Sequence, residues 1–148
     1  MPKHILIPTD GSRVSARGIR AGVQLAQDLG ARVTTVYVIP PWQPAVDFEG
    51  GRLAAGATLE VYKQRTQRAA RKALAAVKIA AQIARVPCTT KTVHAERPWE
   101  GILRTARALR CDLIAMGSHG RGGLAGLFLG SETQRVLANS RIPVLVIR

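Results

Sequence analysis

Short apolar segments alternate with longer helical patterns along the whole chain. The short segments are rich in Val, Ile and Leu and are followed by turn residues, as buried strands are. They lie at residues 3–9, 33–39, 88–94, 112–116 and 144–147. An order of strand, helix, strand repeated in this way predicts a five-stranded parallel sheet with helices on both faces, joined by right-handed crossovers.

The helical segments carry their own start and stop signals. Ser12 is suited to cap the first helix, Gly30 to end it, and Pro98 to open the third helix. The first helix repeats apolar residues at steps of three and four, at Ala16, Ile19, Val23 and Ala26. The second helix is expected over residues 57–84, with one face made by Tyr62, Thr66, Ala69, Ala73, Val77, Ala80 and Ala84.

Length and composition fit one α/β domain over residues 1–148. Hydrophobic residues make up 47% and aromatic residues 4%, so the core must be built from small aliphatic side chains, and disorder is excluded. Cys88 and Cys111 stand alone and read as small buried hydrophobic residues rather than as a disulfide or a metal site. No secretory signal or membrane-length apolar run is visible, so we expect a cytoplasmic protein without membrane contact.

The net charge of +13, from 22 Lys and Arg against 9 Asp and Glu, attracts polyanions. A solvated basic surface without a dedicated partner is the simpler interpretation, and we weigh it higher. Aromatic residues for base stacking are scarce and no helix-turn-helix or RNA-binding motif is present. Nucleic acid is therefore expected only as a non-specific electrostatic partner.

A glycine-rich stretch follows the fourth predicted strand. Gly117, Gly120 and Gly130 belong to it, and a helical pattern begins after Ser131. A strand that opens through glycines into a helix presents backbone N–H groups at the positive end of a helix dipole, which suits phosphate. A capping box made by Ser131 and Gln134 would instead satisfy these N–H groups internally. We favour phosphate binding because a cap does not explain the preceding glycines.

Two motifs stand near the two ends of the chain. They are Ile5-Leu6-Ile7-Pro8-Thr9-Asp10-Gly11-Ser12 and Asp112-Leu113-Ile114-Ala115-Met116-Gly117-Ser118-His119-Gly120, the latter followed by Gly130-Ser131 and Pro143-Val144-Leu145-Val146. In these motifs the chain resembles the universal stress protein family, nearly end to end. The nucleotide-binding branch of that family carries Gly-x2-Gly-x9-Gly-[Ser/Thr], and Gly117, Gly120, Gly130 and Ser131 meet this spacing.

The resemblance implies a Rossmann-like fold of the adenine nucleotide alpha hydrolase type, with its strands in the order 3-2-1-4-5. It also implies ATP at the carboxyl edge of the sheet, Mg²⁺ or Mn²⁺ shared mainly by the phosphates, and a homodimer paired through residues 144–147. The implied nucleotide site runs from the adenosine end to the phosphate end through Pro8, Thr9, Asp10, Val38, Met116, Gly117, His119, Gly120, Arg121, Gly130, Ser131, Glu132 and Thr133.

Several of these residues have a second interpretation. Asp10 suits an ordinary Asp-Gly turn, and His119 and Arg121 suit a solvated loop as well as a phosphate contact. Glu132 departs from the family, in which a small or apolar residue is common at this position. A carboxylate near a triphosphate lowers affinity unless it points away or meets a metal, which leaves ATP and a less charged nucleotide as alternatives.

Two questions stay open at this stage, whether the protein hydrolyses ATP and what residues 40–56 do. No GxxxxGK sequence supplies a P-loop lysine, so efficient ATP hydrolysis is not expected. Slow hydrolysis, with Asp10 or Glu132 positioning a water molecule, is an alternative to a purely regulatory role. Residues 40–56 are rich in Pro and Gly and read as a loop, for which a lid over the nucleotide is one hypothesis.

Overall fold

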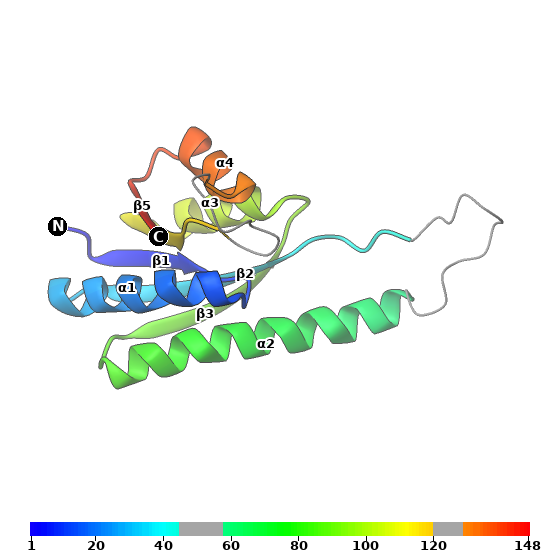
Figure 1. Ribbon diagram of the computed structural model, residues 1–148, viewed down its shortest axis with the longest axis horizontal. Coiled ribbons are helices and arrows are strands. Elements are labelled where there is room, and N and C mark those ends of the chain that lie inside the picture. Colours follow the sequence, from blue (N-terminus) through cyan, green and yellow to red (C-terminus); the bar gives the residue numbers. More distant parts are fainter. Residues whose placement is uncertain (45–57, 120–128) are drawn as a thin grey trace.

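The computed structural model of the chain describes residues 1–44, 58–119 and 129–148. In these ranges, strands and helices alternate as the sequence predicts (Figure 1). In chain order they are β1 (His4–Pro8), α1 (Arg13–Leu29), β2 (Arg32–Ile39), α2 (Leu59–Ile83), β3 (Cys88–His94), α3 (Pro98–Ala108), β4 (Leu113–Gly117), α4 (Ser131–Asn139) and β5 (Val144–Ile147).

The five strands form one parallel sheet in the order β3-β2-β1-β4-β5, which confirms the predicted order. The central strand β1 pairs with both neighbours, and Ile5 lies opposite Val33 on one side and Leu113 on the other. Along the chain, β2 and β3 are added on one side of β1, and β4 and β5 are then added on its other side. In open parallel sheets, ligands bind at the carboxyl ends of the strands flanking such a reversal.

Helices cover both faces of the sheet, with α1 and α2 on one face and α3 and α4 on the other (Figure 1). Alternate residues of β1 face opposite layers. Ile5 and Ile7 belong to the core cluster under α1 and α2, whereas Leu6 belongs to the cluster under α3 and α4. All three are fully buried, and each such side chain contributes about 1.5–3 kcal/mol to stability.

The predicted helix boundaries of α1 and α3 are confirmed. The Ser12 hydroxyl accepts a hydrogen bond from the backbone N–H of Ser15, and Gly30 ends α1 in the left-handed conformation with φ of 61°. Pro98 is the first residue of α3. The N-cap of α3 is Arg97, which forms no side-chain cap hydrogen bond, a feature that matters for the site described below.

The predicted face of α2 packs against the core. Ala73 and Val77 are buried, and the other five predicted residues are half-buried, namely Tyr62, Thr66, Ala69, Ala80 and Ala84. Ala70, Leu74 and Ala81 are buried beside them, so the buried stripe is wider than predicted. Although α2 spans 25 residues, neither it nor another helix in the described ranges has an apolar stretch that could cross a bilayer.

At the amino end of the sheet, His4 and Asp112 fasten β1 to its neighbours. Asp112 Oδ2 accepts the backbone N–H groups of Lys3 and His4 at 2.7 and 2.8 Å, and these bonds lower the pKa of the Asp112 carboxyl. The buried His4 ring bonds the Thr34 hydroxyl through Nε2 at 2.8 Å. Burial, followed by the charge of Arg32, lowers the pKa of His4. His4 therefore has a structural role.

Candidate functional site

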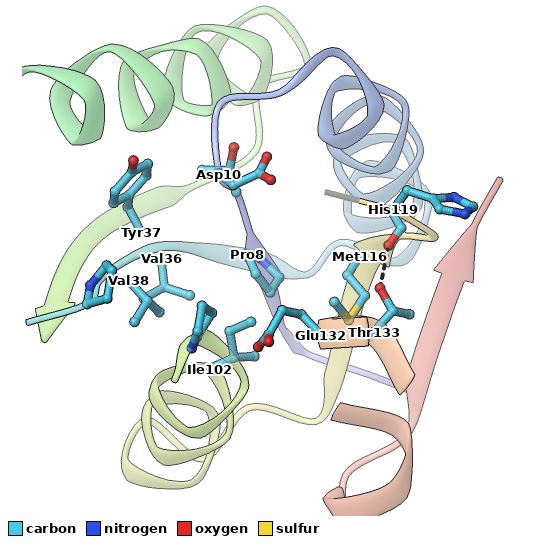
Figure 2. Close-up of a pocket in the computed structure, with 14 residues that line it drawn as sticks. Pro8, Asp10, Val36, Tyr37, Val38, Ile102, Met116, His119, Glu132 and Thr133 are labelled. Carbon is cyan, nitrogen blue, oxygen red and sulfur yellow. Dashed lines mark hydrogen bonds between the residues drawn. The ribbon is translucent and has the colours of Figure 1, made fainter. Parts of the chain in front are cut away.

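A cavity of about 320 Å³ opens at the carboxyl ends of β1, β2 and β4, beside the first turns of α3 and α4 (Figure 2). It lies at the reversal of strand order, where the fold places a ligand. Its wall is formed by Pro8, Thr9, Asp10, Val36, Tyr37, Val38, Pro40, Pro98, Ile102, Met116, Gly117, His119, Glu132 and Thr133.

The structure brings most of the predicted site residues together around this cavity. Those that line it are Pro8, Thr9, Asp10, Val38, Met116, Gly117, His119, Glu132 and Thr133. Gly130 and Ser131 lie at the start of α4, directly before two lining residues, but do not themselves line the cavity. Gly120 and Arg121 fall outside the described residues, as does most of the segment for which a lid is one hypothesis.

Sequence reasoning missed five lining residues, Val36, Tyr37, Pro40, Pro98 and Ile102. The signal for the first three was their place at the end of a predicted strand, where ligands gather in such sheets. Pro98 and Ile102 were identified only as helix residues. Their contribution depends on α3 packing next to β2, which the periodicity of either segment does not encode.

One end of the cavity is apolar. Figure 2 shows Val36 and Val38 of β2 and Ile102 of α3 together at this end, whereas Met116 of β4 lies next to Thr133. The helix α3 approaches closely because residue 101 is glycine. A Cβ atom at that position would stand 2.8 and 2.9 Å from the two methyl groups of Val38.

The turn after β1 is held by local hydrogen bonds. Asp10 Oδ1 accepts the backbone N–H of Ser12 at 2.9 Å, and the Thr9 hydroxyl accepts that of Gly11 at 3.2 Å. Gly11 has φ of 78°, a conformation in which other residues are strained. Asp10 is thus a turn residue that also lines the cavity.

The end of β4 is joined to α4 and β5 through the backbone of Ser118. The Ser118 N–H donates to the carbonyl of Ile147 at 2.8 Å, and the Ser118 carbonyl accepts the N–H of Gly130 at 2.7 Å. The buried Thr133 hydroxyl donates to the carbonyl of Gly117 at 3.1 Å, the contact drawn in Figure 2. These bonds fix the first turn of α4 against the floor of the cavity.

The capping box that was the alternative interpretation of the start of α4 does not form. Gly130 is the N-cap, Ser131 is the first helical residue, and no side chain caps this end in the described ranges. The Gln134 side chain instead donates to the carbonyl of Leu129 at 2.7 Å. Glycine has no side chain with which to cap, so the first-turn N–H groups are left for another acceptor. Such a helix end, beside a cavity, suits an anionic group.

Glu132 is held by contacts on both of its carboxylate oxygens. Oε2 accepts the backbone N–H of Trp99 at 2.8 Å, and Oε1 lies 3.3 Å from the Arg135 guanidinium. Trp99 is in the first turn of α3, the helix whose N-cap residue supplies no cap of its own. Glu132 therefore caps a neighbouring helix while lining the cavity, and its negative charge is favoured at that end of the α3 dipole.

The cavity offers little to a metal ion by itself. In the described ranges, no group of three or more His, Cys, Asp and Glu side chains is placed to hold one. The wall carboxylates, Asp10 and Glu132, already accept backbone N–H groups. A divalent cation that enters with a polyphosphate would be held mainly by the phosphate oxygens, with these carboxylates as outer neighbours.

Relatives of this chain are found by both sequence and structure. A universal stress protein of Thermus aquaticus is 34% identical over 148 residues, which covers 100% of both chains. The universal stress protein MJ0531 of Methanocaldococcus jannaschii is 33% identical over 146 residues, covering 99% of this chain and 82% of that protein. The solved structure of the protein MJ0577 superposes with a TM-score of 0.77 at 25% identity, covering 98% of this chain and 94% of that one.

Two solved structures with the same fold contain nucleotides. One is a universal stress protein in complex with cAMP, with a TM-score of 0.72 and 20% identity over 99% of this chain and 97% of that one. The other is the universal stress protein of Archaeoglobus fulgidus in complex with dAMP, with a TM-score of 0.67 and 18% identity over 100% and 98%. The model of the universal stress protein family matches residues 1–148, and the chain therefore belongs to that family.

Proposed function

We propose that the cavity binds an adenine nucleotide, with ATP and Mg²⁺ or Mn²⁺ as the ligand favoured by the glycine spacing, and that binding serves regulation. One observation carries this proposal. An apolar compartment and an uncapped helix N-terminus lie at the same cavity, at the reversal of strand order. A base needs the first feature and a phosphate group needs the second.

The proposed orientation follows from the two ends of the cavity. The base lies among Val36, Val38 and Ile102, and the Asp10 carboxylate is within the wall on which the ribose rests. The phosphates run past Gly117 toward the first-turn N–H groups of α4. A volume of about 320 Å³ is at the lower end of the range typical of small-molecule sites.

The solved relatives support an adenine nucleotide as the ligand class. The two complexes named above contain cAMP and dAMP, which share the adenine ring and carry a single phosphate group. Their sequence identity to this chain is low, so they support the class of ligand and leave the number of phosphates to be tested.

Regulation fits the site better than catalysis does. Both carboxylate oxygens of Glu132 are engaged, so this side chain is not available as a base for water. Ligand binding to the folded state alone stabilises it by about 2.7 kcal/mol when the free ligand is 100-fold above its dissociation constant. Nucleotide supply would then control how much folded protein is present.

We further propose a homodimer paired through β5. This strand is at the edge of the sheet, pairs with β4, and consists of apolar residues, of which Leu145 is 38% exposed. An exposed apolar edge strand is a template for pairing with a second chain. Pairing of two β5 strands would continue the sheet across both subunits.

A pair of variants at Ser131 tests the nucleotide proposal. Proline is tolerated at the first position of a helix but has no N–H, so Ser131→Pro removes one donor, whereas Ser131→Ala removes the hydroxyl alone. Calorimetric titration should show weaker AMP and Mg·ATP binding for the proline variant, with adenosine binding unchanged. Absence of binding by every adenine compound to the wild-type protein would contradict the proposal.

A further inference from the structure

The wall of the cavity has a charge opposite to that of the protein. The chain carries a net charge of +13, yet none of the lining residues in the described ranges is Lys or Arg. Two carboxylates, those of Asp10 and Glu132, belong to the wall instead (Figure 2). A polyphosphate that enters this part of the site meets two carboxylates, and the half-exposed Arg135 guanidinium lies 3.3 Å from Glu132 Oε1.

Glu132 is fixed in this position by its neighbours. Figure 2 shows its side chain pointing toward α3, where Oε2 accepts the N–H of Trp99 at 2.8 Å. The next residue, Thr133, is 2% exposed, and its hydroxyl bonds the Gly117 carbonyl, which holds the backbone of the first turn. The carboxylate cannot swing away from an incoming phosphate without giving up the cap of α3.

We propose that Glu132 acts as a charge filter at the phosphate end of the cavity, an inference that rests on the nucleotide-binding function proposed above. The filter admits a nucleotide monophosphate without metal and makes the binding of ATP depend on a divalent cation that neutralises its outer phosphates. Repulsion from a carboxylate grows with the number of phosphate charges and is strong in a partly buried site. A cation on the outer phosphates cancels the additional charge.

Capping of α3 alone does not explain a charged residue at this position. The amide oxygen of glutamine can also accept the N–H of Trp99, so the cap does not require a carboxylate. The pair with Arg135 is on the surface, where side chains are 52% and 34% exposed, and such pairs contribute little to stability. Glu132→Gln therefore removes the charge and leaves the fold and the cap in place.

The test is calorimetric titration of the full chain with AMP, with ATP in EDTA, and with ATP in excess Mg²⁺. The wild-type protein should bind metal-free ATP about tenfold more weakly than AMP, and Mg²⁺ should remove most of this difference. Glu132→Gln should bring metal-free ATP to within about threefold of AMP. Glu100→Gln is the matched control, since Glu100 is in the first turn of α3, the turn that Glu132 caps, but does not line the cavity.

The outcomes separate the two proposals. If AMP binds but the ratio of AMP to metal-free ATP affinity is the same in the wild-type protein and in Glu132→Gln, the filter is refuted and the nucleotide function stands. If neither AMP nor Mg·ATP binds the wild-type protein, both fall. Glu132→Asp keeps the charge and should keep the wild-type ratio, so loss of the ratio in this variant would also overturn the filter, even if Glu132→Gln proved unstable.

Discussion

Gly18 of α1 lies so close to the end of β4 that a Cβ atom on it would stand 2.7 Å from the backbone nitrogen of Gly117. Gly117 in turn forms part of the cavity wall and accepts the hydroxyl of Thr133. The contact between the two glycine backbones thus sets how near α1 approaches the floor of the proposed nucleotide site. Any side chain at position 18 must push the helix or the strand end away.

Gly18→Ala should destabilise the protein by about 1–3 kcal/mol, because overpacking against backbone outweighs the gain of about 1 kcal/mol in helix propensity. Urea denaturation measures this change. Gly22→Ala is the matched control on the same face of α1, since its Cβ would meet the end of the flexible Ile7 side chain at 2.9 Å. Equal destabilisation by the two substitutions would show that the Gly18 contact is not special.

Gly101→Ala should weaken nucleotide binding about fivefold with a smaller effect on stability. The added methyl group would stand 2.8 Å from Val38 Cγ1 and push the valine into the apolar end of the cavity. Val38→Ala in the same chain removes the clash and should restore part of the affinity. Calorimetric titration with AMP measures both, and a double variant no better than Gly101→Ala would contradict the explanation.

His4 should make the fold less stable in mild acid. Burial and Arg32 lower the pKa of His4 from its usual 6.5, so below pH 6.5 the unfolded chain binds a proton that the folded chain does not. Stability is therefore complete above pH 6.5 and falls as the pH drops through the folded value. The melting temperature of His4→Asn should fall less on acidification than that of the wild-type protein.

The exposed His94, on the edge strand β3, supplies the control His94→Asn, which should retain the wild-type pH dependence.

Asp112 affects stability at lower pH than His4 does. Its pKa is also lowered, from 3.8, by the N–H groups of Lys3 and His4, so its contribution is present above pH 3.8 and is lost in stronger acid. A His4→Asn slope equal to that of the wild-type protein would assign the acid sensitivity to other groups.

Leu145→Lys should convert the proposed dimer to a monomer, because it places a charge in the middle of the edge strand β5. Light scattering coupled to size exclusion measures the mass. Ile83→Lys provides the comparison, since Ile83 is 81% exposed at the end of α2 and does not belong to the sheet edge. A wild-type protein that elutes as a monomer at all concentrations would contradict pairing through β5.

The order of strands and helices along the chain was predictable because each element is marked by residues within its own segment. Runs such as Ile5 to Ile7 reveal a strand, and residues such as Ser12, Gly30 and Pro98 mark where helices begin and end. The strand order came from the family resemblance, since periodicity does not record which strands become neighbours. The face of α2 followed from its spacing, but its full width did not, because an alanine-rich helix has few bulky residues to mark where the buried stripe ends.

The cavity residues that belong to the family motifs could be predicted from the sequence. Those that line the cavity only because two elements pack together could not. Six residues of the two motifs line the cavity, namely Pro8, Thr9, Asp10, Met116, Gly117 and His119, and their binding role stays a prediction. Ile102 lines the cavity with them because Gly101 has no side chain and α3 can therefore pack closely against β2. No sequence motif indicates this contact. The Glu132 contact with Trp99 joins residues 33 positions apart and leaves no trace in the sequence pattern.

The N–H of Ser118 donates to Ile147 of the last strand, and its carbonyl accepts the N–H of Gly130, the residue before α4. Its own side chain takes no part in either bond. Proline at this position would lack the N–H and would break the bond to β5, whatever its effect on the carbonyl. If two subunits pair along β5 as proposed, Ser118 connects the subunit contact to the residue before α4 through its own backbone alone.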